Sequence, residues 1–315
     1  NSDGYIDRAT SDLDAYFFQG TFQDESTLIK ALVFGGQEVT YQAYWGIDAV
    51  TLQTNRTYNT GGEIYNESGN RNDFYDNQVD NFAQEHYQFH WNERLNSNWN
   101  FTLGLNYTHG SGFYDDYNDL WYDQNISFSG ATSFDYLQLK PFTIGDTTIS
   151  DSENISQKRL DNDYYVITLG LNYNTEDTSF NFGGLYSYYV GDHFGDLIWG
   201  QNLGEVLPNH RFYENQGIKK EGSFFAKATQ TLSEGFTGFI DLQLRSIGYQ
   251  VSGQIVGPAS LSVDYKFVIF NPKAGLTYEV ASGQKLYFSY AKAQREPNRT
   301  DYENGNPKPE KLDDF

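Results

Sequence analysis

Apolar and polar side chains alternate with a period of two along several stretches of the chain. In residues 99–107 the odd positions are Trp, Phe, Leu, Leu and Tyr, and the even positions are Asn, Thr, Gly and Asn. The same alternation occurs in residues 164–173, 180–188, 236–244 and 286–290. Because successive side chains of a β-strand point to opposite faces, each stretch predicts a strand with one apolar and one polar face.

The connections between these predicted strands alternate between short and long. Short turns are expected at residues 23–26, 96–98, 174–178, 233–235 and 281–284. Long polar connections are expected at about 40–79, 112–158, 191–216, 251–262 and 295–310. The pattern predicts about ten strands in five up-and-down pairs. Short turns at one end and long loops at the other are typical of an outer-membrane barrel with periplasmic turns and extracellular loops.

The predicted fold class is therefore all-β, an antiparallel transmembrane outer-membrane β-barrel. A closed barrel of about ten strands would have a narrow interior filled by its own side chains. Residues 311–315 resemble the start of a further strand, and the chain begins at Asn1 with no Met and no signal peptide. We therefore expect residues 1–315 to be an internal part of a larger parent barrel.

Composition supports a barrel and argues against several other classes. Aromatic residues make up 17% of the chain, which suits aromatic girdles at both membrane interfaces. Mean hydropathy is −0.65, and no stretch approaches the roughly 18–20 apolar residues of a transmembrane helix. That value carries little weight for a barrel, because only alternate residues of a membrane strand face lipid. The net charge of −21 argues against nucleic-acid binding, and the lack of Cys excludes thiolate sites.

Five groups of segments carry a more specific signal. They are residues 2–9 with 13–19, 86–93 with 107–114, 189–199, 270–276 with 287–291 and 295–302, and 306–310. The fourth group includes Phe270-Asn-Pro-Lys-Ala-Gly-Leu276, and the fifth is Asn306-Pro-Lys-Pro-Glu310. In this order the segments resemble TonB-dependent outer-membrane receptors, especially those of the Bacteroidetes type, over the middle and later part of the barrel.

The resemblance implies a barrel of 22 strands whose lumen is closed by an N-terminal plug. It also implies that extracellular loops capture a substrate, which is admitted when TonB pulls on the plug. Residues 1–315 would then be a partial barrel domain, with the plug, the TonB box, the early strands and the last strands outside the chain.

The function implied is active transport of a scarce nutrient, with an iron–siderophore-type chelate as the first expected ligand, at the bacterial outer membrane. The partners implied are the TonB complex, reached through the absent plug and TonB box, the nutrient ligand and outer-membrane lipid. Two alternatives stay open: a passive porin or structural outer-membrane barrel, and a soluble all-β glycan-binding protein.

Candidate ligand contacts lie in the expected extracellular loops. Residues 112–124 place aromatic rings among carboxylates, a composition that suits an ordered loop first, ligand capture second and calcium binding third. The ligand-contact candidates are Tyr114, Tyr117, Trp121, Tyr122, His193 and Trp199.

A second set of candidates is expected to contact the plug. His86 and His90 lie four apart on the polar face of one predicted strand, roughly 13 Å from each other, which is too far to share a metal. They are expected to line the lumen. The charged residues at 295–299, namely Arg295, Glu296 and Arg299, end a strand and are candidates for packing against the plug.

No catalytic constellation is found in the sequence. There is no nucleophile elbow, phosphate-binding glycine loop or HExxH motif, and Asp115-Asp116 is interpreted as loop polarity. We therefore expect no enzyme activity, no cofactor and no metal site.

Overall fold

One antiparallel sheet of eleven strands makes up most of the molecule. The structure, a computed structural model, describes residues 1–66, 68–120, 132–255, 260–298, 301 and 310–311. A two-residue strand, β1 (Ser2–Asp3), lies at one edge. The ten long strands are β2 (Thr10–Gln23), β3 (Thr27–Tyr41), β6 (Val79–Arg94), β7 (Trp99–Asn118), β10 (Asn154–Asn174), β11 (Thr178–Gly200), β12 (His210–Ser233), β13 (Phe236–Gln254), β14 (Ser260–Ala281) and β15 (Gln284–Ala291).

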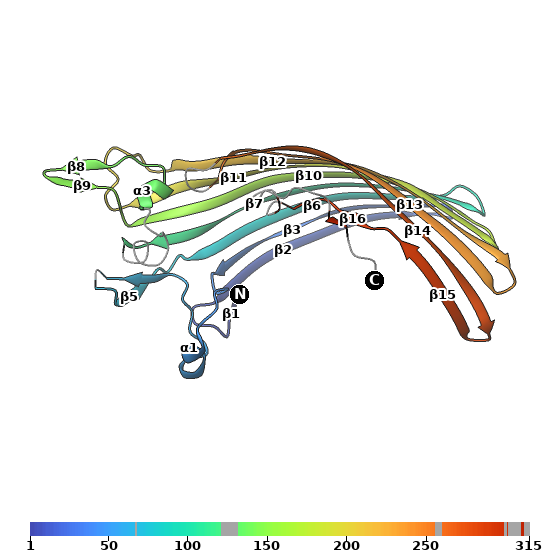
Figure 1. Ribbon diagram of the computed structural model, residues 1–315, viewed down its shortest axis with the longest axis horizontal. Helices are drawn as coiled ribbons and strands as arrows, with labels where there is room; N and C mark the ends of the chain where they lie inside the picture. The colour runs from blue at the N-terminus through green and yellow to red at the C-terminus, as the bar shows by residue number, and fades with distance from the viewer. Residues whose placement is uncertain (67, 121–131, 256–259, 299–300, 302–309, 312–315) are drawn as a thin grey trace.

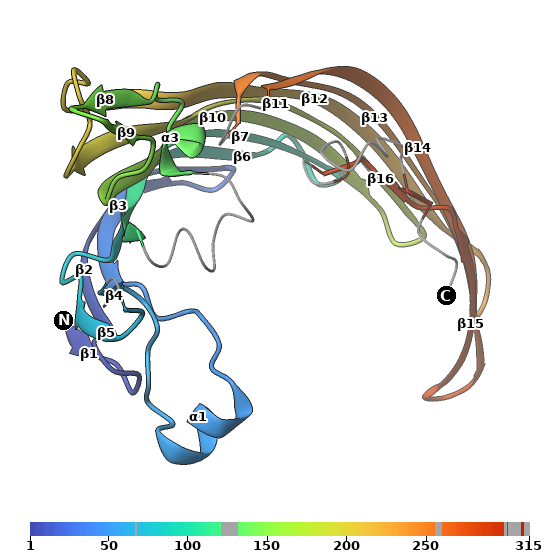
Figure 2. The ribbon, with the colours of Figure 1, turned by 60° about the vertical axis from the view of Figure 1, so that its left-hand side comes forward.

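The sheet curls into a trough (Figure 1). Each long strand pairs with the next in chain order, from β2 to β15. Figure 2 shows β2 and β15 on opposite sides of the open trough, and in the described ranges they do not pair with each other. The fold is therefore a barrel wall that is curved but not closed.

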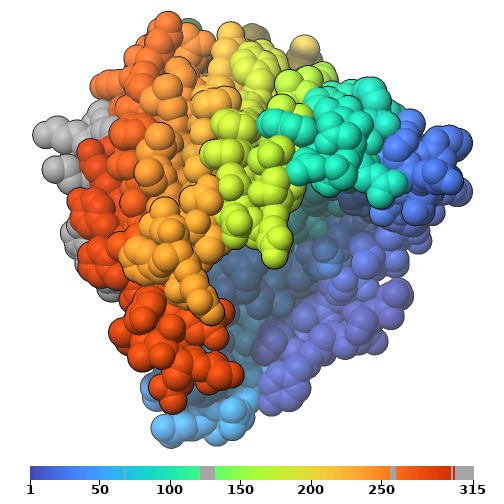
Figure 3. Space-filling view, turned by 90° about the vertical axis from the view of Figure 1, so that its right-hand side faces the viewer, coloured from blue at the N-terminus to red at the C-terminus, as the bar shows by residue number. Residues whose placement is uncertain are grey.

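The long strands form five hairpins, as the alternation of short and long connections predicts. The hairpins join β2 to β3, β6 to β7, β10 to β11, β12 to β13 and β14 to β15. Figure 3 looks onto the end of the trough that carries the short turns, which surround a hollow. In the first turn the Asp24 carboxylate accepts the backbone N–H groups of Ser26 and Thr27, both at 2.8 Å.

Small elements lie in the remaining connections. They are α1 (Ala49–Thr54), β4 (Glu63–Tyr65), β5 (Arg71–Phe74), α3 (Ser133–Tyr136), β8 (Phe142–Ile144), β9 (Thr147–Ile149), β16 (Gln294–Arg295) and β17 (Glu310–Lys311). Asp48 caps α1 by accepting the backbone N–H groups of Val50 and Thr51 at 2.8 and 3.1 Å. Within the described ranges, no helix has the length and apolar character to cross a membrane.

The convex face of the sheet carries two rows of aromatic rings. The register places Tyr87, Tyr107, Tyr165 and Tyr188 side by side on four neighbouring strands. Their ring centroids are 5.8, 4.8 and 6.3 Å apart in that order. Nearer the short turns, a second row contains Trp99, Tyr173 and Phe180, with centroids 4.8 and 6.0 Å apart. These rows have the form of the two aromatic girdles of a membrane barrel.

Apolar side chains fill the convex face between the two rows. Leu105 pairs with Ile167, and Leu103 pairs with Leu169, whose side chain is 49% exposed. The rows are eight residues apart on β10, roughly 27 Å along the strand, which after strand tilt covers most of a ~25 Å apolar band. The exposed apolar surface is thus explained by contact with lipid.

On β6 and β7 the concave face is polar over the same length of strand that carries the apolar band on the convex face. The Gln88 amide donates to Asn106 Oδ1 at 3.1 Å, and His86 Nδ1 is hydrogen-bonded to Thr108 Oγ1 at 3.0 Å. His90 lies on the same face, with Nε2 3.3 Å from Gln88 Oε1. A lumen needs such polar lining because it is wet.

Six strands extend farther toward the long connections than the sequence predicts. The expected loop boundaries at 112–158, 191–216 and 251–262 are wrong, because β7 reaches Asn118, β10 begins at Asn154, β11 reaches Gly200, β12 begins at His210, and β13 and β14 continue to Gln254 and from Ser260. Alternation ends where neither face meets lipid, but the backbone hydrogen bonds between strands continue. Polarity alone therefore misplaced the strand ends.

The orientation of Leu169 gives a test of the membrane-facing wall. In the full-length protein refolded into bilayers, Leu169→Arg is expected to lower the free energy of unfolding by about 2–4 kcal/mol, because a cation near the bilayer midplane loses hydration. Urea titration followed by tryptophan fluorescence measures this change. Its neighbour Thr168 points to the concave face, so Thr168→Arg is the matched control and should cost less than about 1 kcal/mol. Equal losses would contradict the assignment of the two faces.

Candidate ligand-binding site

A cavity of about 460 Å³ lies at the end of the trough with the long connections. We call it the mouth cavity. It is formed by the connection after β3, the end of β7, the start of β10 and helix α3. Its lining includes Tyr44, Trp45, Glu63, Gln78, Tyr114, Asp116, Tyr117, Asn118, Tyr136 and Lys158. Five aromatic rings with few charges make this a surface suited to binding a small molecule.

Lys158 and Asp116 form an ion pair in the wall of the mouth cavity. Lys158 Nζ lies 2.9 Å from Asp116 Oδ2, and the two side chains are only 20% and 19% exposed. The ammonium also lies 5.0 Å from the ring centroid of Tyr114 and 5.8 Å from that of Tyr136. Gln78 Nε2 donates to the other carboxylate oxygen of Asp116 at 3.0 Å. The charges are thus neutralised within the wall.

The connection that carries Tyr44 and Trp45 is fixed to the strands by hydrogen bonds. The Tyr41 hydroxyl donates to the carbonyl oxygens of Gly61 and Tyr75 at 3.1 and 2.8 Å. The Gln42 amide donates to the carbonyl oxygen of Asp115 at 2.8 Å. Gly62 has φ +73°, and a Cβ there would lie 2.5 Å from the Tyr41 hydroxyl, so only glycine fits.

Helix α3 is positioned by an apolar cluster beside the mouth cavity. Leu137, Leu197, Phe212 and Tyr213 are buried together, and Tyr136 packs against them. The helix begins with a capping box, in which Thr132 and Asp135 satisfy each other's backbone N–H groups. The cluster therefore holds the Tyr136 ring over Lys158.

The pKa values of two tyrosine hydroxyls of the mouth cavity, those of Tyr136 and Tyr44, are raised. Burial raises the pKa of Tyr136 above its ordinary value, although Lys158 lowers it in part. Burial and the carboxylate of Asp116 raise the pKa of Tyr44. Both hydroxyls therefore keep their protons at neutral pH. Around them, Glu63 accepts hydrogen bonds from the hydroxyls of Tyr58 and Tyr65.

Comparison with known protein families identifies this wall. The family described as "TonB dependent receptor-like, beta-barrel" matches residues 40–315. The chain belongs to the TonB-dependent receptor family. The family consists of transport receptors of the Gram-negative outer membrane, not of enzymes. No curated protein matches the chain.

Solved receptor structures share the fold at low sequence identity. The chain is similar to the ferric citrate transporter FecA, with 11% identity, a TM-score of 0.65, and coverage of 97% of this chain and 40% of that one. It is also similar to the siderophore receptor PiuA from Acinetobacter baumannii, with 13% identity, a TM-score of 0.60 and coverage of 91% and 43%. It is similar as well to the copper transporter OprC, with 10% identity, a TM-score of 0.59, and coverage of 92% of this chain and 38% of that one. The chain thus spans less than half the length of these receptors.

The receptor barrel brings two of the six ligand-contact candidates into the mouth cavity. Tyr114 and Tyr117 both line it, from the extension of β7 and not from a loop. His193 lies on the concave face of β11, opposite Leu160 and Asn215. Trp199 pairs with Ile155 and is 44% exposed, on the convex side of the wall. Trp121 and Tyr122 lie outside the described residues.

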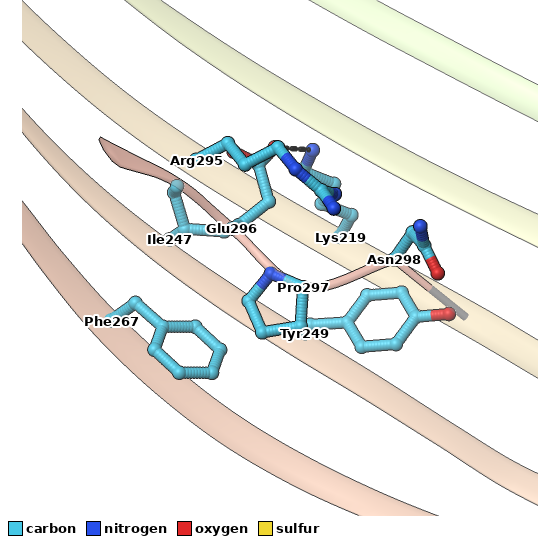
Figure 4. A pocket seen from close by; sticks show the side chains of 8 residues that line it. All are labelled: Lys219, Ile247, Tyr249, Phe267, Arg295, Glu296, Pro297 and Asn298. Atoms are coloured by element: carbon cyan, nitrogen blue, oxygen red, sulfur yellow. Dashed lines mark hydrogen bonds and ion pairs between the residues drawn. The ribbon is translucent and has the colours of Figure 1, made fainter. Parts of the chain in front are cut away.

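The plug-contact candidates mostly face the lumen. His86 and His90 share the concave face of β6 with Gln88. Arg295 and Glu296 lie in a segment that crosses the concave face of β12 and β13 (Figure 4), with Arg295 Nη1 3.9 Å from Asp301 Oδ2. Arg299 lies outside the described residues. Lumen orientation is what contact with a plug requires, and contact itself stays a prediction.

Glu296 is the centre of a charged cluster on the lumen wall. Its carboxylate lies 2.5 Å from Lys219 Nζ and 3.1 Å from Arg245 Nη1. Arg245 Nε is also 2.8 Å from Glu221 Oε1. The cluster borders a cavity of about 370 Å³, whose lining also includes Pro297 and Tyr249 (Figure 4). Every charge in the cluster has an opposite partner, so the cluster binds the 295–298 segment to the wall.

Several residues of the mouth cavity were missed by reasoning from sequence. Tyr44, Trp45, Tyr136 and Lys158 come from three separate connections or strand ends, and no local pattern joins them. The aromatic run at 41–45 was the available signal. Across the part of the chain that the structure describes, no group of three or more His, Cys, Asp or Glu side chains is arranged to hold a metal ion.

The Tyr41 hydroxyl gives a test of how the mouth cavity is held together. Tyr41→Phe is expected to cost about 1 kcal/mol locally, because the carbonyl oxygens of Tyr75 and Gly61 lose the Tyr41 donor, although Gly61 also accepts from Arg8 Nη2 at 3.2 Å. Hydrogen exchange of residues 42–62 in the full-length receptor should become about fivefold faster. Tyr87→Phe removes the hydroxyl of an exposed tyrosine that is bonded to Glu85, and it is the matched control, expected to leave that exchange unchanged. Unchanged exchange in Tyr41→Phe would show that other contacts hold the connection.

Proposed function

We propose that the protein is an active transport receptor that imports a scarce nutrient across the bacterial outer membrane, with an iron–siderophore-type chelate as its ligand. This chain supplies a wall of the barrel and part of the extracellular mouth. Coupling to the TonB complex occurs through a plug and TonB box elsewhere in the receptor. The observation that carries the proposal is the aromatic mouth cavity on a TonB-dependent receptor barrel.

The size and lining of the mouth cavity support ligand capture. Its volume of about 460 Å³ lies within the usual range of small-molecule sites. Tyr44 and Trp45 stack with ring centroids 4.3 Å apart, which makes one broad aromatic surface. Such rings give large contact areas with little loss of side-chain entropy, and their hydroxyl and N–H groups add hydrogen bonds. A receptor that must bind a dilute nutrient needs contact of this kind.

Energy-dependent iron uptake tests the proposal. A strain of the native host that lacks the gene should grow more slowly under iron limitation, and the full-length gene should restore growth. Uptake of radioactive iron from a mixture of ferric siderophores should stop when the proton-motive force is dissipated. A passive porin would continue to admit solute, and a soluble glycan-binding protein would leave iron uptake unaffected. Normal growth and uptake in the deletion strain would remove the iron-chelate proposal.

Tyr114 provides a test within the mouth cavity. Tyr114→Ala in the full-length receptor should lower ligand affinity about five- to thirtyfold, because a ring in the binding surface contributes on the order of 1–2 kcal/mol. Direct binding to receptor-bearing cells measures the change. Tyr5→Ala removes a ring that is 73% exposed and lies outside the mouth cavity, so it is the matched control. Equal binding by the Tyr114→Ala and unaltered receptors would move the ligand site elsewhere.

A further inference from the structure

The mouth cavity has one cationic side chain among its described lining residues, that of Lys158. Its ammonium is already engaged, 2.9 Å from Asp116 and over the rings of Tyr114 and Tyr136. An anionic ligand that took Lys158 as its partner would leave the carboxylate of Asp116 largely buried without a cation. Such a carboxylate is strongly unfavourable. Among the described lining residues, no cation is therefore available to attract an anion, and the nearby Arg8 and Arg71, which are outside that lining, donate to the Gly61 carbonyl oxygen and the Tyr58 hydroxyl.

The remaining charge in the lining is negative. Glu63 faces the cavity as a carboxylate, held by the hydroxyl of Tyr65 at 2.6 Å. Two carboxylates thus stand against one ammonium in the described lining. An incoming anion is repelled at the distance where contacts form.

The faces of the aromatic rings also disfavour an anionic ligand. The Tyr44 and Trp45 rings stack at an interplanar angle of 27°, and Tyr114 and Tyr117 also line the cavity. Ring faces carry the negative part of the aromatic quadrupole, so they attract C–H groups and cations and not anions. The Asn118 amide and the hydroxyls of Tyr44 and Tyr117 already donate to neighbouring oxygens, so the ring faces are the main contact surface for a ligand. The free contact surface suits a polar ligand without net negative charge.

We propose that the mouth cavity selects uncharged ferric complexes over anionic ones. This inference rests on the proposed function and names the ligand class within it. A ferric ion bound by three hydroxamate groups is uncharged overall, because each hydroxamate loses one proton. A ferric ion bound by three catecholates, each of which loses two protons, is a trianion. Both complexes are similar in size, so charge is the property that separates them.

A binding comparison tests the inference. Full-length receptor, purified in detergent with its plug, is titrated with ferrichrome, an uncharged trihydroxamate complex, and with ferric enterobactin, a trianionic tris-catecholate complex. Isothermal titration calorimetry at moderate salt gives both dissociation constants. Ferrichrome is expected to bind at least about tenfold more tightly. Tighter binding of the trianion would overturn the inference and leave the proposed function intact.

Variants of the Asp116–Lys158 ion pair test whether charge is the cause of the selection. Asp116→Asn frees the Lys158 ammonium and should improve trianion binding at least about tenfold. Lys158→Met removes the ammonium and should not improve trianion binding. The matched control is Glu279→Gln, which removes the partner of Lys285 at the end with the short turns. No gain for the trianion in Asp116→Asn would overturn the inference.

Iron uptake by the deletion strain distinguishes failure of the proposed function from failure of the inference about ligand charge. If neither complex binds and the deletion strain takes up iron normally, the proposed function and the inference both fail. If neither complex binds but deletion abolishes iron uptake, the receptor imports another ferric complex and the inference fails alone.

Discussion

The backbone hydrogen bonds between neighbouring strands are the interaction on which the rest of the structure depends. Inside a bilayer no water is available to pair with backbone groups, so each strand must bond to a strand on either side. This need is independent of side chains. The ladder between β7 and β10 accordingly continues from Trp99–Tyr173 to Asn118–Asn154, well beyond the aromatic row at Tyr107. The same ladder that crosses the membrane also positions Tyr114, Asp116 and Lys158 beyond it.

Because the hydrogen-bond ladder fixes the backbone, the polarity of the side chains can vary along each strand and between the convex and concave faces. Between the aromatic rows the convex positions are apolar and the concave positions polar, since lipid lies on one side and the lumen on the other. Beyond the rows neither face meets lipid. There Asp116 pairs with Lys158 on the neighbouring strand and accepts a hydrogen bond from Gln78, which directly precedes β6. A charged pair of this kind is stable because rings and neighbouring strands exclude water while both charges stay paired.

The sequence was sufficient for features that depend on local spacing. Alternation identified the five hairpins and the concave position of His86 and His90, since both follow from a period of two. It failed where the structure departs from that period. An extra residue, Ile198, lies between the pairs Ser156–Leu197 and Ile155–Trp199, and this bulge turns Trp199 to the convex side. The mouth cavity was also hidden, because Trp45 and Lys158 meet only through tertiary packing.

The charge of the whole chain and the charge of the mouth cavity act on ligands over different distances. The net charge of −21 is spread over a long sheet, and salt screens it beyond about 8–10 Å. Glu63 and Asp116 act at contact distance, where rings and strands limit screening. Selection by charge therefore depends on these two carboxylates and on Lys158 more than on overall acidity. The acidic surface also repels anions as they approach. Long-range approach and direct contact therefore both favour a ligand without negative charge.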